Sequence, residues 1–327
     1  MANLILAGDI GGTKTLLGLF EPAPEHPRRP RRIDVRAFAT LEYDELPRMI
    51  EAFLQGTGAR DRIATACFGA AGPVVDETVT LTNVPWRVDA RRVGPRFGFD
   101  RVWLLNDLQA MAYAVPVLEE SELVTLQQGR PMADGNIAII AAGTGLGEAL
   151  LHRIDGRRVP SPSEGGHADF AARTGREVTL MRDLTARFGR ADVEHVISGR
   201  GLLNIHRVCH PAACVAVIDL DDPKAPAAIT AAAIDGRCPG CAETLDLFVE
   251  AYGAEAGNLA LRSVATGGVF IGGGIAPKIL PVMTSGAFMG AFCAKAPLEA
   301  MLRSMPVKIV LNEEAGLIGA AVFADSI

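Results

Sequence analysis

The stretch Gly8-Asp9-Ile10-Gly11-Gly12-Thr13-Lys14 decides how this chain of 327 residues is interpreted, because a short apolar segment lies on each side of it. Residues 4–7 and 15–20 have the length and composition of buried strands, and Pro22 ends the second. The pattern predicts a hairpin with Asp9 beside its tip. Glycines let the backbone approach a phosphate closely, and successive N–H groups of a turn can bind an anion. We interpret the hairpin as a phosphate-binding turn with a carboxylate placed for a metal ion, although a plain tight turn also explains the glycines.

Two familiar phosphate-binding loops do not fit this stretch. A Walker loop has a glycine before its lysine, and here Thr13 precedes Lys14. A dinucleotide fingerprint requires a helix after the glycines, and residues 16–20 followed by Pro22 are too few to form one.

A later segment repeats the design of the opening hairpin. Residues 137–142 are apolar, residues 143–147 read Gly-Thr-Gly-Leu-Gly, and residues 148–152 again suit a strand. Two similar hairpins, one in each half of the chain, could hold one polyphosphate from two sides.

The composition is that of an ordinary folded protein, with 49% hydrophobic and 21% charged residues. The length exceeds what one core usually fills, so two domains are expected. A net charge of −6 gives no support to a nucleic-acid-binding surface. No secretory signal and no apolar run of membrane-spanning length is visible, so we expect no membrane segment, a cytoplasmic location and reduced thiols at the six cysteines.

Strand-like and helix-like patterns alternate along the chain, which indicates an α/β layered fold. Further strands are expected at residues 33–39, 63–68, 79–81, 102–105 and 269–272, and helices at residues 44–55, 108–115 and 313–323 and from Pro277 onward. Residues 22–32 contain four prolines and four arginines. Because the rest of the chain is acidic, we interpret them as a solvated hairpin loop and not as a basic arm for nucleic acid.

Asn106 and Asp107 stand where the expected strand at 102–105 ends. In open α/β sheets ligands bind beyond the carboxyl ends of strands, so Asp107 is a candidate to accept a proton from a substrate hydroxyl. The alternative is that one of the two caps the helix that follows. This segment alone favours the cap.

A second polar segment reads Ser163-Glu164-Gly165-Gly166-His167. Its glycines permit a bend that points Glu164 and His167 the same way, and a carboxylate beside an imidazole suits hydrogen bonding to neighbouring hydroxyls of a sugar. An ordinary turn is the alternative. Glu194 precedes an apolar stretch and, taken alone, is interpreted as a solvated helix residue.

Histidines and cysteines gather between residues 206 and 241. The spacing of His206, Cys209, His210 and Cys214 could place three of them on one helix face, and a Cys-x-x-Cys pair follows at Cys238 and Cys241. Pro211 interrupts the helix, and no single segment completes a two-plus-two zinc pattern. The sequence therefore disfavours a zinc site.

Together these motifs resemble the bacterial glucokinase family, which belongs with the hexokinases to the actin-like ATPase superfamily. The resemblance covers nearly the full chain and rests on seven segments in order. They are GDIGGTKT (8–15), TNVPW (82–86), LLNDLQA (104–110), AAGTGLG (141–147), SEGGHADF (163–170), EHVISGRGL (194–202) and GGVFIGGGIAP (267–277).

The resemblance implies a two-lobed actin-like ATPase (ribonuclease H-like) fold, α/β in class, with a mixed sheet in each lobe and a cleft between the lobes. Residues 1–117 with 311–327 would form a small domain and residues 118–310 a large one. Closing the lobes would exclude water and limit wasteful ATP hydrolysis.

It also implies roles for single residues. Asp107 would bind the sugar 6-hydroxyl as the general base, and other hydroxyls would be held by Asn106, Glu164, His167 and Glu194. The nucleotide would be bound by Gly8, Asp9, Ile10, Gly11, Gly12 and Thr13, by Gly143, Thr144 and Gly145, and near the adenosine by Gly272, Gly273 and Gly274. Asp9 would lie near Mg²⁺.

The implied function is ATP-dependent phosphorylation of glucose at its 6-hydroxyl, by a cytoplasmic homodimer that takes part in glycolysis and has no nucleic-acid or membrane partner. A kinase for another hexose or an amino sugar, as in the ROK family, is one alternative. A nucleotide-switched binding protein of the same superfamily is another, and it would not require the polar segments at 106–107 and 163–167. The ROK family carries a cysteine-rich zinc motif, of which residues 238–241 are only a fragment, and ROK repressors carry an N-terminal helix-turn-helix that is not seen before Leu4.

Overall fold

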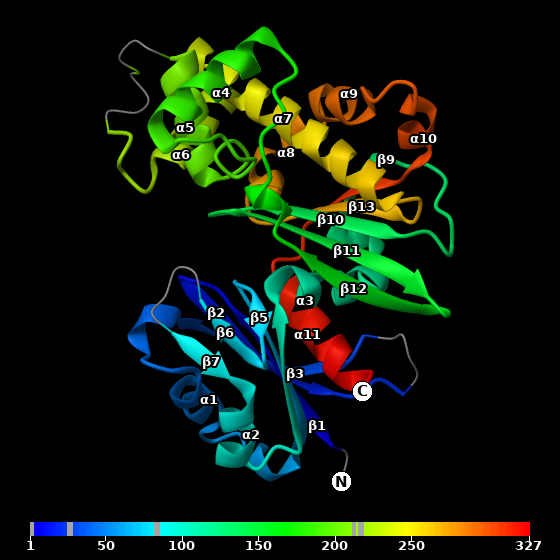
Figure 1. The fold of residues 1–327 in the computed structure, drawn as a ribbon. Helices are drawn as coiled ribbons and strands as arrows, with labels where there is room; N and C mark the ends of the chain where they lie inside the picture. Colours follow the sequence, from blue (N-terminus) through cyan, green and yellow to red (C-terminus); the bar gives the residue numbers. More distant parts are fainter. Residues whose placement is uncertain (1–2, 25–28, 82–85, 211–213, 215–218) are drawn as a thin grey trace. The chain divides into compact units, whose positions relative to one another are not determined.

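The computed structural model describes residues 3–24, 29–81, 86–210, 214 and 219–327. By their internal contacts these form two compact units, which we name the first unit (Met1–Glu122 with Asn312–Ile327) and the second unit (Leu123–Leu311). Each is built on its own mixed sheet with helices packed against it (Figure 1). The α/β class expected from the alternating patterns is confirmed. The first four residues of the TNVPW segment lie outside the described residues.

The main sheet of the first unit has the strand order β3-β2-β1-β4-β8. Its strands are β1 (Leu4–Ile10), β2 (Lys14–Glu21), β3 (Arg31–Ala39), β4 (Ile63–Ala70) and β8 (Arg101–Asn106). The first three strands run antiparallel to one another, whereas β4 lies parallel to β1 and β8 parallel to β4. A small sheet adds β5 (Val74–Val75), β6 (Thr78–Thr80) and β7 (Arg87–Asp89).

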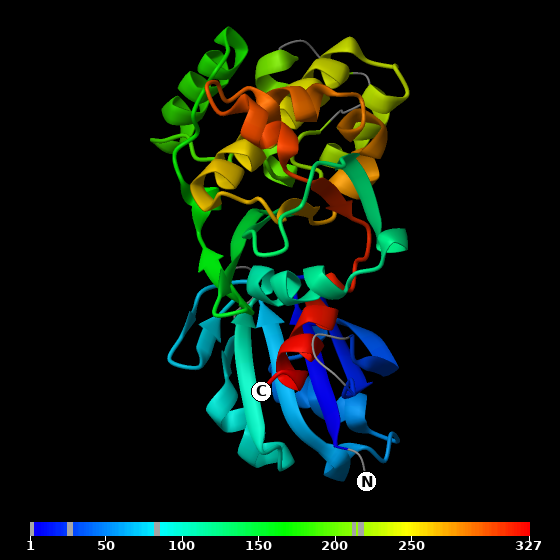
Figure 2. The same cartoon turned by 90° about the vertical axis from the view of Figure 1, so that its right-hand side faces the viewer.

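Both faces of this main sheet are covered by helices, namely α1 (Leu46–Leu54), α2 (Ala90–Phe97), α3 (Asp107–Ala114) and α11 (Ala315–Asp325). Alternate residues of β1 belong to different cores: Leu4 and Leu6 pack with α1, whereas Ile5 and Ala7 pack with α11. A strand buried on both faces has a continuous apolar sequence, which is why residues 4–7 show no alternation of apolar and polar residues. Helices α3 and α11 lie side by side in both views (Figures 1 and 2).

The sheet of the second unit has the order β12-β11-β10-β13-β14-β9. Its strands are β9 (Leu123–Gln127), β10 (Ile137–Ala142), β11 (Leu146–Ile154), β12 (Arg157–Ser163), β13 (Gly268–Gly272) and β14 (Val307–Val310). As in the first unit, three consecutive strands, β10, β11 and β12, form an antiparallel set. The parallel strands β13 and β14 follow on the other side of β10. The two sheets therefore share one topology, with β9 as an additional antiparallel edge in the second.

Seven α-helices are described in the second unit: α4 (Gly175–Phe188), α5 (Gly199–Cys209), α6 (Ala225–Ile234), α7 (Pro239–Ser263), α8 (Leu280–Met283), α9 (Ala287–Cys293) and α10 (Glu299–Ser304). The long helix α7, yellow in Figure 1, packs against α5, α6, α9 and β10. It is buried on nearly every side, with Phe248 and Tyr252 fully covered. Because α7 is so deeply buried, its side chains hold the segments that they contact in place. One of these segments is the carboxyl end of β10.

Both predicted glycine hairpins are confirmed. The strand pairs close at Ile10 with Thr15 and at Ala142 with Leu146, so residues 11–14 and 143–145 are the turns. The helix expected from Pro277 begins differently, as a 3₁₀ turn η6 (Ala276–Ile279) followed by the short α8. Pro277 and Pro281 lack backbone N–H groups, so a regular helix cannot continue through them.

Three of the four arginines in the proline-rich segment 22–32 are described, and each forms an ion pair with an acidic side chain. Arg29 precedes β3 and pairs with Glu122 at 2.9 Å. Arg31 and Arg32 are the first residues of β3 and pair with Glu21 and with Glu314, the latter at 2.8 Å. Among the described residues, no helix has the length and apolarity needed to cross a membrane.

Candidate active site

The first glycine turn is held by the segment that follows β3. Thr40 donates its backbone N–H to the Thr13 carbonyl at 3.0 Å and its hydroxyl to the Gly11 carbonyl at 2.8 Å. The turn closes with Gly11 N–H donating to the Lys14 carbonyl at 3.1 Å, and a Cβ on Gly11 would come within 2.8 Å of the Lys14 carbonyl oxygen. Only glycine therefore permits this turn, as expected for a backbone shaped to approach a ligand.

Asp9 lies one residue before the end of β1 with its carboxylate against the start of α11. A Cβ on Gly316 would stand 2.8 Å from the Asp9 Oδ2 atom, so the first turn of α11 packs directly on this carboxylate. Burial first and the charge of Asp107 second raise the pKa of Asp9 to about 7, against the opposing effect of Lys14. Carboxylate oxygens are the ligands that Mg²⁺ takes in proteins, and a cation here would relieve the repulsion between the two acids, so the residues fit such an ion.

Asn106 and Asp107 stand at the end of β8, and the helix cap predicted as an alternative is confirmed for Asn106. Its Oδ1 accepts from Leu108 N–H at 2.9 Å and from Gln109 N–H at 3.4 Å. The Gln109 side chain in turn accepts from Asn106 N–H at 3.2 Å, and the two bonds between Asn106 and Gln109 form a capping box. The Asn106 amide also donates to the Gly72 carbonyl at 3.3 Å. Asp107 begins α3 two strands from Asp9. Gly69 on the intervening strand pairs with Asp9, and a Cβ on Gly69 would lie 3.7 Å from the Asp107 Cα.

The second glycine turn is shaped by Glu194. Gly143 N–H donates to the Gly145 carbonyl at 2.8 Å, and the Gly143 carbonyl accepts from Gly199 N–H at 2.9 Å. Glu194 Oε2 accepts from Leu146 N–H at 2.8 Å, and a Cβ on Gly145 would lie 2.5 Å from that oxygen. The interpretation of Glu194 as a solvated helix residue is wrong: it is half-buried in a turn, and its carboxylate covers Gly145.

Glu194 also joins this turn to the polar segment at 163–167. Its backbone N–H donates to the Gly166 carbonyl at 2.8 Å, while His167 N–H donates to the Glu164 carbonyl at 3.0 Å. A Cβ on Gly166 would meet the Leu146 carbonyl oxygen at 2.2 Å. The structure therefore brings Glu194, the second glycine turn and the polar segment together, from three separate parts of the sequence.

The imidazole of His167 faces solvent. Its side chain is 58% exposed, and the nearest carboxylate in an ion-pair contact is that of Asp192 at 3.7 Å, which lies closer to His195 at 3.0 Å. Arg190 donates to the backbone carbonyl of His167. The backbone is thus fixed while the ring remains accessible to a ligand.

The glycines after β13 pack against the same turn. Gly273 has a φ of 80°, and a Cβ there would lie 2.3 Å from the Ala142 carbonyl oxygen. The Ala142 N–H donates to the hydroxyl of Tyr252 at 3.1 Å, and this hydroxyl lies 3.5 Å from the Gly272 carbonyl. One tyrosine from α7 therefore ties together the ends of β10 and β13, which precede residues 143–145 and 273–274.

Sequence reasoning missed Tyr252, Glu148 and Gly316. Glu148 on β11 is 1% exposed and lies beneath the polar segment, where a Cβ on Gly165 would meet its Oε2 at 2.0 Å. A carboxylate inside an otherwise apolar strand and a tyrosine inside a small-residue helix are visible signals in the sequence. The partners of these side chains are not visible, because Gly165 lies 17 residues from Glu148 and Ala142 lies 110 residues from Tyr252.

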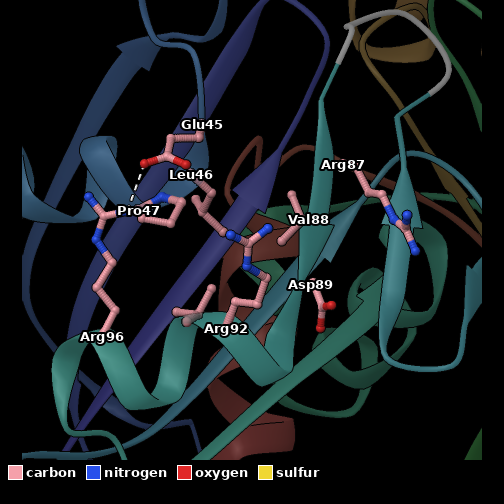
Figure 3. Close-up of a pocket in the computed structure, with 9 residues that line it drawn as sticks. Glu45, Leu46, Pro47, Arg87, Val88, Asp89, Arg92 and Arg96 are labelled. Carbon is pink, nitrogen blue, oxygen red and sulfur yellow. Dashed lines mark hydrogen bonds and ion pairs between the residues drawn. The ribbon is translucent and has the colours of Figure 1, made fainter.

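The first unit also contains a cavity, which Figure 3 shows with the residues that line it. It has a volume of about 290 Å³ and is formed by α1, β7 and α2. Its arginines include Arg96, which is paired with Glu45 at 2.7 Å, while Asp89 pairs with Arg91 at 2.9 Å. None of the predicted site residues lines it, so we do not assign it to the active site.

The arrangement of the histidine and cysteine residues differs from what the sequence suggested. Helix α5 ends at Cys209, so Cys214 lies outside it, and Cys209 does not join the group. Cys238 and Cys241 are not an isolated fragment, because Cys214, His206 and His210 surround them. The ligand set could not be recognised from one segment, since it comes from three.

Comparisons with known proteins show that this chain is a hexose kinase. The sequence model of the family described as Glucokinase matches residues 6–327. A glucokinase of Trichormus variabilis is 38% identical to this chain, with 98% of this chain and 99% of the relative aligned. The chain belongs to the glucokinase family.

Solved structures give the same result. The crystal structure of a glucokinase from an Antarctic psychrotroph superposes with a TM-score of 0.88 at 29% identity and covers 100% of both chains. A ROK family glucokinase from Streptomyces griseus, crystallised with glucose and AMPPNP, gives a TM-score of 0.67 at 22% identity over 99% of this chain and 100% of that one. At that identity the second comparison supports the fold alone.

Proposed function

We propose that this enzyme transfers the γ-phosphoryl group of ATP to the 6-hydroxyl of glucose, with Asp107 accepting the proton of that hydroxyl. The observation that carries the proposal is the pair of acids at the strand ends of the first unit, Asp107 after β8 and Asp9 near the end of β1, beside the first glycine turn. Membership of the glucokinase family supports glucose as acceptor and ATP as donor.

The residues divide into groups that match the needs of phosphoryl transfer, which are positioning and charge neutralisation. We assign the phosphates to Gly8–Thr13 and to Gly143, Thr144 and Gly145, and the adenosine to Gly272, Gly273 and Gly274. Mg²⁺ bound near Asp9 with the nucleotide would neutralise phosphate charge. The close approaches at Gly11, Gly145 and Gly273, where a Cβ would clash, support backbone recognition of the nucleotide.

We assign the remaining sugar hydroxyls to Glu164, His167, Glu194 and Asn106. The hydrogen bonds among residues 143–146, 163–167 and 194 support one polar site built by the first three of these residues. Asn106 has a narrower role than the sequence suggested, because its carbonyl oxygen is used by the helix cap and only its amide can donate to a sugar.

We further propose that the two units are the lobes of an actin-like ATPase (ribonuclease H-like) fold with the substrates bound in a cleft between them. The shared strand order of the two sheets supports this assignment. The domain bounds expected from the sequence, residues 1–117 with 311–327 and residues 118–310, differ from the bounds of these units by five residues or fewer. A homodimeric state, a cytoplasmic location and a place in glycolysis stay predictions from the family resemblance.

The test is a coupled assay of ADP release across hexoses, amino sugars and phosphoryl donors. Asp107→Asn should lower turnover with glucose by about two to four decades, the range for removal of a general base, while the glucose KM changes little. Asp100→Asn provides the matched control, since Asp100 is exposed just before the same strand. Unchanged turnover in the Asp107 variant removes Asp107 from its role.

The same assay decides between the alternatives. Faster turnover with mannose, fructose or an N-acetylated amino sugar than with glucose would make the chain a kinase for that sugar. If no sugar stimulates ADP release, the nucleotide-switched binding protein is favoured. Turnover with ADP or polyphosphate in place of ATP would reassign the donor.

A further inference from the structure

We infer that the second unit holds a structural zinc ion bound by the thiolates of Cys214, Cys238 and Cys241 and the imidazole of His206. The residues come from the end of α5, from the segment that follows it and from the first turn of α7. None of them belongs to the proposed active site, and the chemistry assigned to that site does not use them.

The spacing of the sulfur atoms is the first observation. Cys214 Sγ lies 3.8 Å from Cys238 Sγ and 3.7 Å from Cys241 Sγ. Zinc binds thiolate sulfur at about 2.3 Å in tetrahedral geometry, and the edge of such a tetrahedron is about 1.63 times the bond length, or about 3.8 Å. A disulfide would bring two sulfurs to about 2.05 Å. The three thiols are thus free, and both measured separations equal the edge of a zinc tetrahedron.

The hydrogen bonds that fix the tautomer of His206 are the second observation. Thr244 donates its only hydroxyl hydrogen to the Gly240 carbonyl at 2.7 Å, so its oxygen accepts the hydrogen bond from His206 Nδ1 at 3.2 Å. Nδ1 therefore carries the hydrogen, and the lone pair is left on Nε2. Zinc-binding histidines typically have this arrangement, in which an outer hydrogen bond fixes the tautomer and the ring orientation.

Position and burial support the same assignment. The His206 ligand nitrogen lies within 4.8 Å of the Cys214 and Cys241 sulfurs, and His206, Cys238 and Cys241 are each less than 5% exposed. Cys238 is the N-cap of α7, and Cys241 lies in its first turn.

His210 is the competing fourth ligand, because Cys238 forms a group with Cys214 and His210, whereas His206 forms one with Cys214 and Cys241. Its ring lies within 4.8 Å of the Cys214 and Cys238 sulfurs and packs on Gly240, where a Cβ would come within 2.2 Å of the ring. We assign the fourth position to His206 because its ring is buried and its tautomer is fixed by Thr244. His210 then serves as a neighbour that covers the turn between the two cysteines of α7.

Such an ion would join the segment carrying Cys214 to the start of α7. Helix α7 also carries Tyr252, whose hydroxyl holds the end of β10 before the second glycine turn. The zinc ion would therefore stabilise the second unit without contacting a substrate. Its removal should change stability and thiol reactivity before it changes the chemistry of phosphoryl transfer.

The experiment measures metal content in the full-length protein, purified without chelators from zinc-containing medium. Elemental analysis should find about one zinc ion per chain in the wild type. The variants Cys214→Ser, Cys238→Ser, Cys241→Ser and His206→Gln should each lose zinc content by about tenfold or more, since each removes a ligand. Cys209→Ser is the matched control, because Cys209 lies at the end of the same α5 but outside the cluster, and it should retain zinc.

Cobalt substitution identifies the ligand types. Co²⁺ in place of zinc should give a thiolate-to-metal charge-transfer absorption that is lost in Cys238→Ser and retained in Cys209→Ser. Comparison of His206→Gln with His210→Gln then fixes the fourth ligand. If His210→Gln loses the metal and His206→Gln retains it, the assignment of His206 is overturned.

A further measurement on the wild type keeps the inference testable if the cysteine variants do not fold. Stripping zinc with a chelator should lower the melting temperature and make three more thiols reactive toward a thiol reagent. Wild-type protein that holds no zinc after incubation with excess Zn²⁺, a disulfide among Cys214, Cys238 and Cys241 found by mass spectrometry, or equal metal loss in Cys209→Ser would each overturn the inference.

Discussion

At the scale of single residues, Glu148 has an unusual environment. It is 1% exposed on β11, and among the described residues its Oε1 atom has no hydrogen-bond partner. Burial first and the charge of Glu255 second raise the pKa of Glu148 to about 7, against the opposing effect of Arg262. The folded protein therefore holds a proton on Glu148 at pH values where the unfolded chain has released it.

This environment predicts a specific dependence of stability on pH. Between about pH 4.5 and 7 the folded state binds more protons than the unfolded state, so the free energy of unfolding falls as the pH rises. Glu148→Gln removes this contribution, and its stability relative to wild type should increase by about 3 kcal/mol from pH 4.5 to pH 8. Urea unfolding at both pH values measures the change.

Asp246→Asn is the control for that measurement, since Asp246 is exposed on α7 of the same unit. It should follow the wild type at both pH values. A stability difference between Glu148→Gln and wild type that is the same at pH 4.5 and pH 8 would show that Glu148 is ionised in the folded protein.

Candidate site residues could be proposed from the sequence where the chemistry depends on neighbours along the chain. Asp9 beside its glycines and Glu164 beside His167 are such candidates, because a short segment contains the whole pattern. Tyr252 and Gly316 were missed because their importance depends on contacts with Ala142 and Asp9, which are distant in the sequence. A local pattern carries no information on such pairs.

At the scale of elements, the turn after β13 distinguishes two adjacent glycines. Gly273 has a φ of 80° and faces the Ala142 carbonyl oxygen, whereas a Cβ on Gly274 would meet no atom within 4 Å. Gly273→Ala should destabilise the protein by about 2–4 kcal/mol, because a left-handed backbone and a backbone clash both oppose the methyl group. Gly274→Ala should change stability by less than about 1 kcal/mol.

Thermal or urea unfolding of the two variants provides the comparison. Because the turn packs on the start of the second glycine turn, Gly273→Ala should also weaken ATP binding, measured by calorimetry. Equal stability of the two variants would mean that the turn can move away from Ala142, and the backbone contact would then not define its shape.

The elements themselves were predictable where periodicity and turn chemistry agree. The two hairpins follow from apolar runs on either side of a glycine turn, α1 from a helical stripe of apolar residues, and α11 from an apolar run of helical length. The helix from Pro277 was only partly right, since two prolines divide it into η6 and α8. The zinc ligands could not be assembled from sequence because α5, the segment with Cys214 and α7 meet only after folding.

At the scale of the whole molecule, the two sheets repeat one strand order although their sequences share only the glycine hairpin. The duplication was visible in the hairpins, but the common topology was not, because strand order depends on which distant strands pair. Under the proposed function, each unit would supply one phosphate-binding turn.

That proposal makes a prediction that involves both units at once. If Asn106 and Asp107 of the first unit bind the same glucose as Glu164 of the second, binding should slow amide hydrogen exchange at residues 104–110 and at residues 163–170 together. Glu164→Ala should raise the glucose KM by about tenfold to a hundredfold, since hydrogen bonds to a charged group contribute about 1.5–3 kcal/mol. At a glucose concentration that saturates the wild type but not this variant, protection should decrease in both segments, although Glu164 belongs to only one. The control is Asp246→Asn, in the same unit as Glu164, which should leave both effects intact. In Glu164→Ala, protection could instead persist at 104–110 and disappear at 163–170. That outcome would mean that the two units bind glucose independently, and the shared sugar site would have to be abandoned.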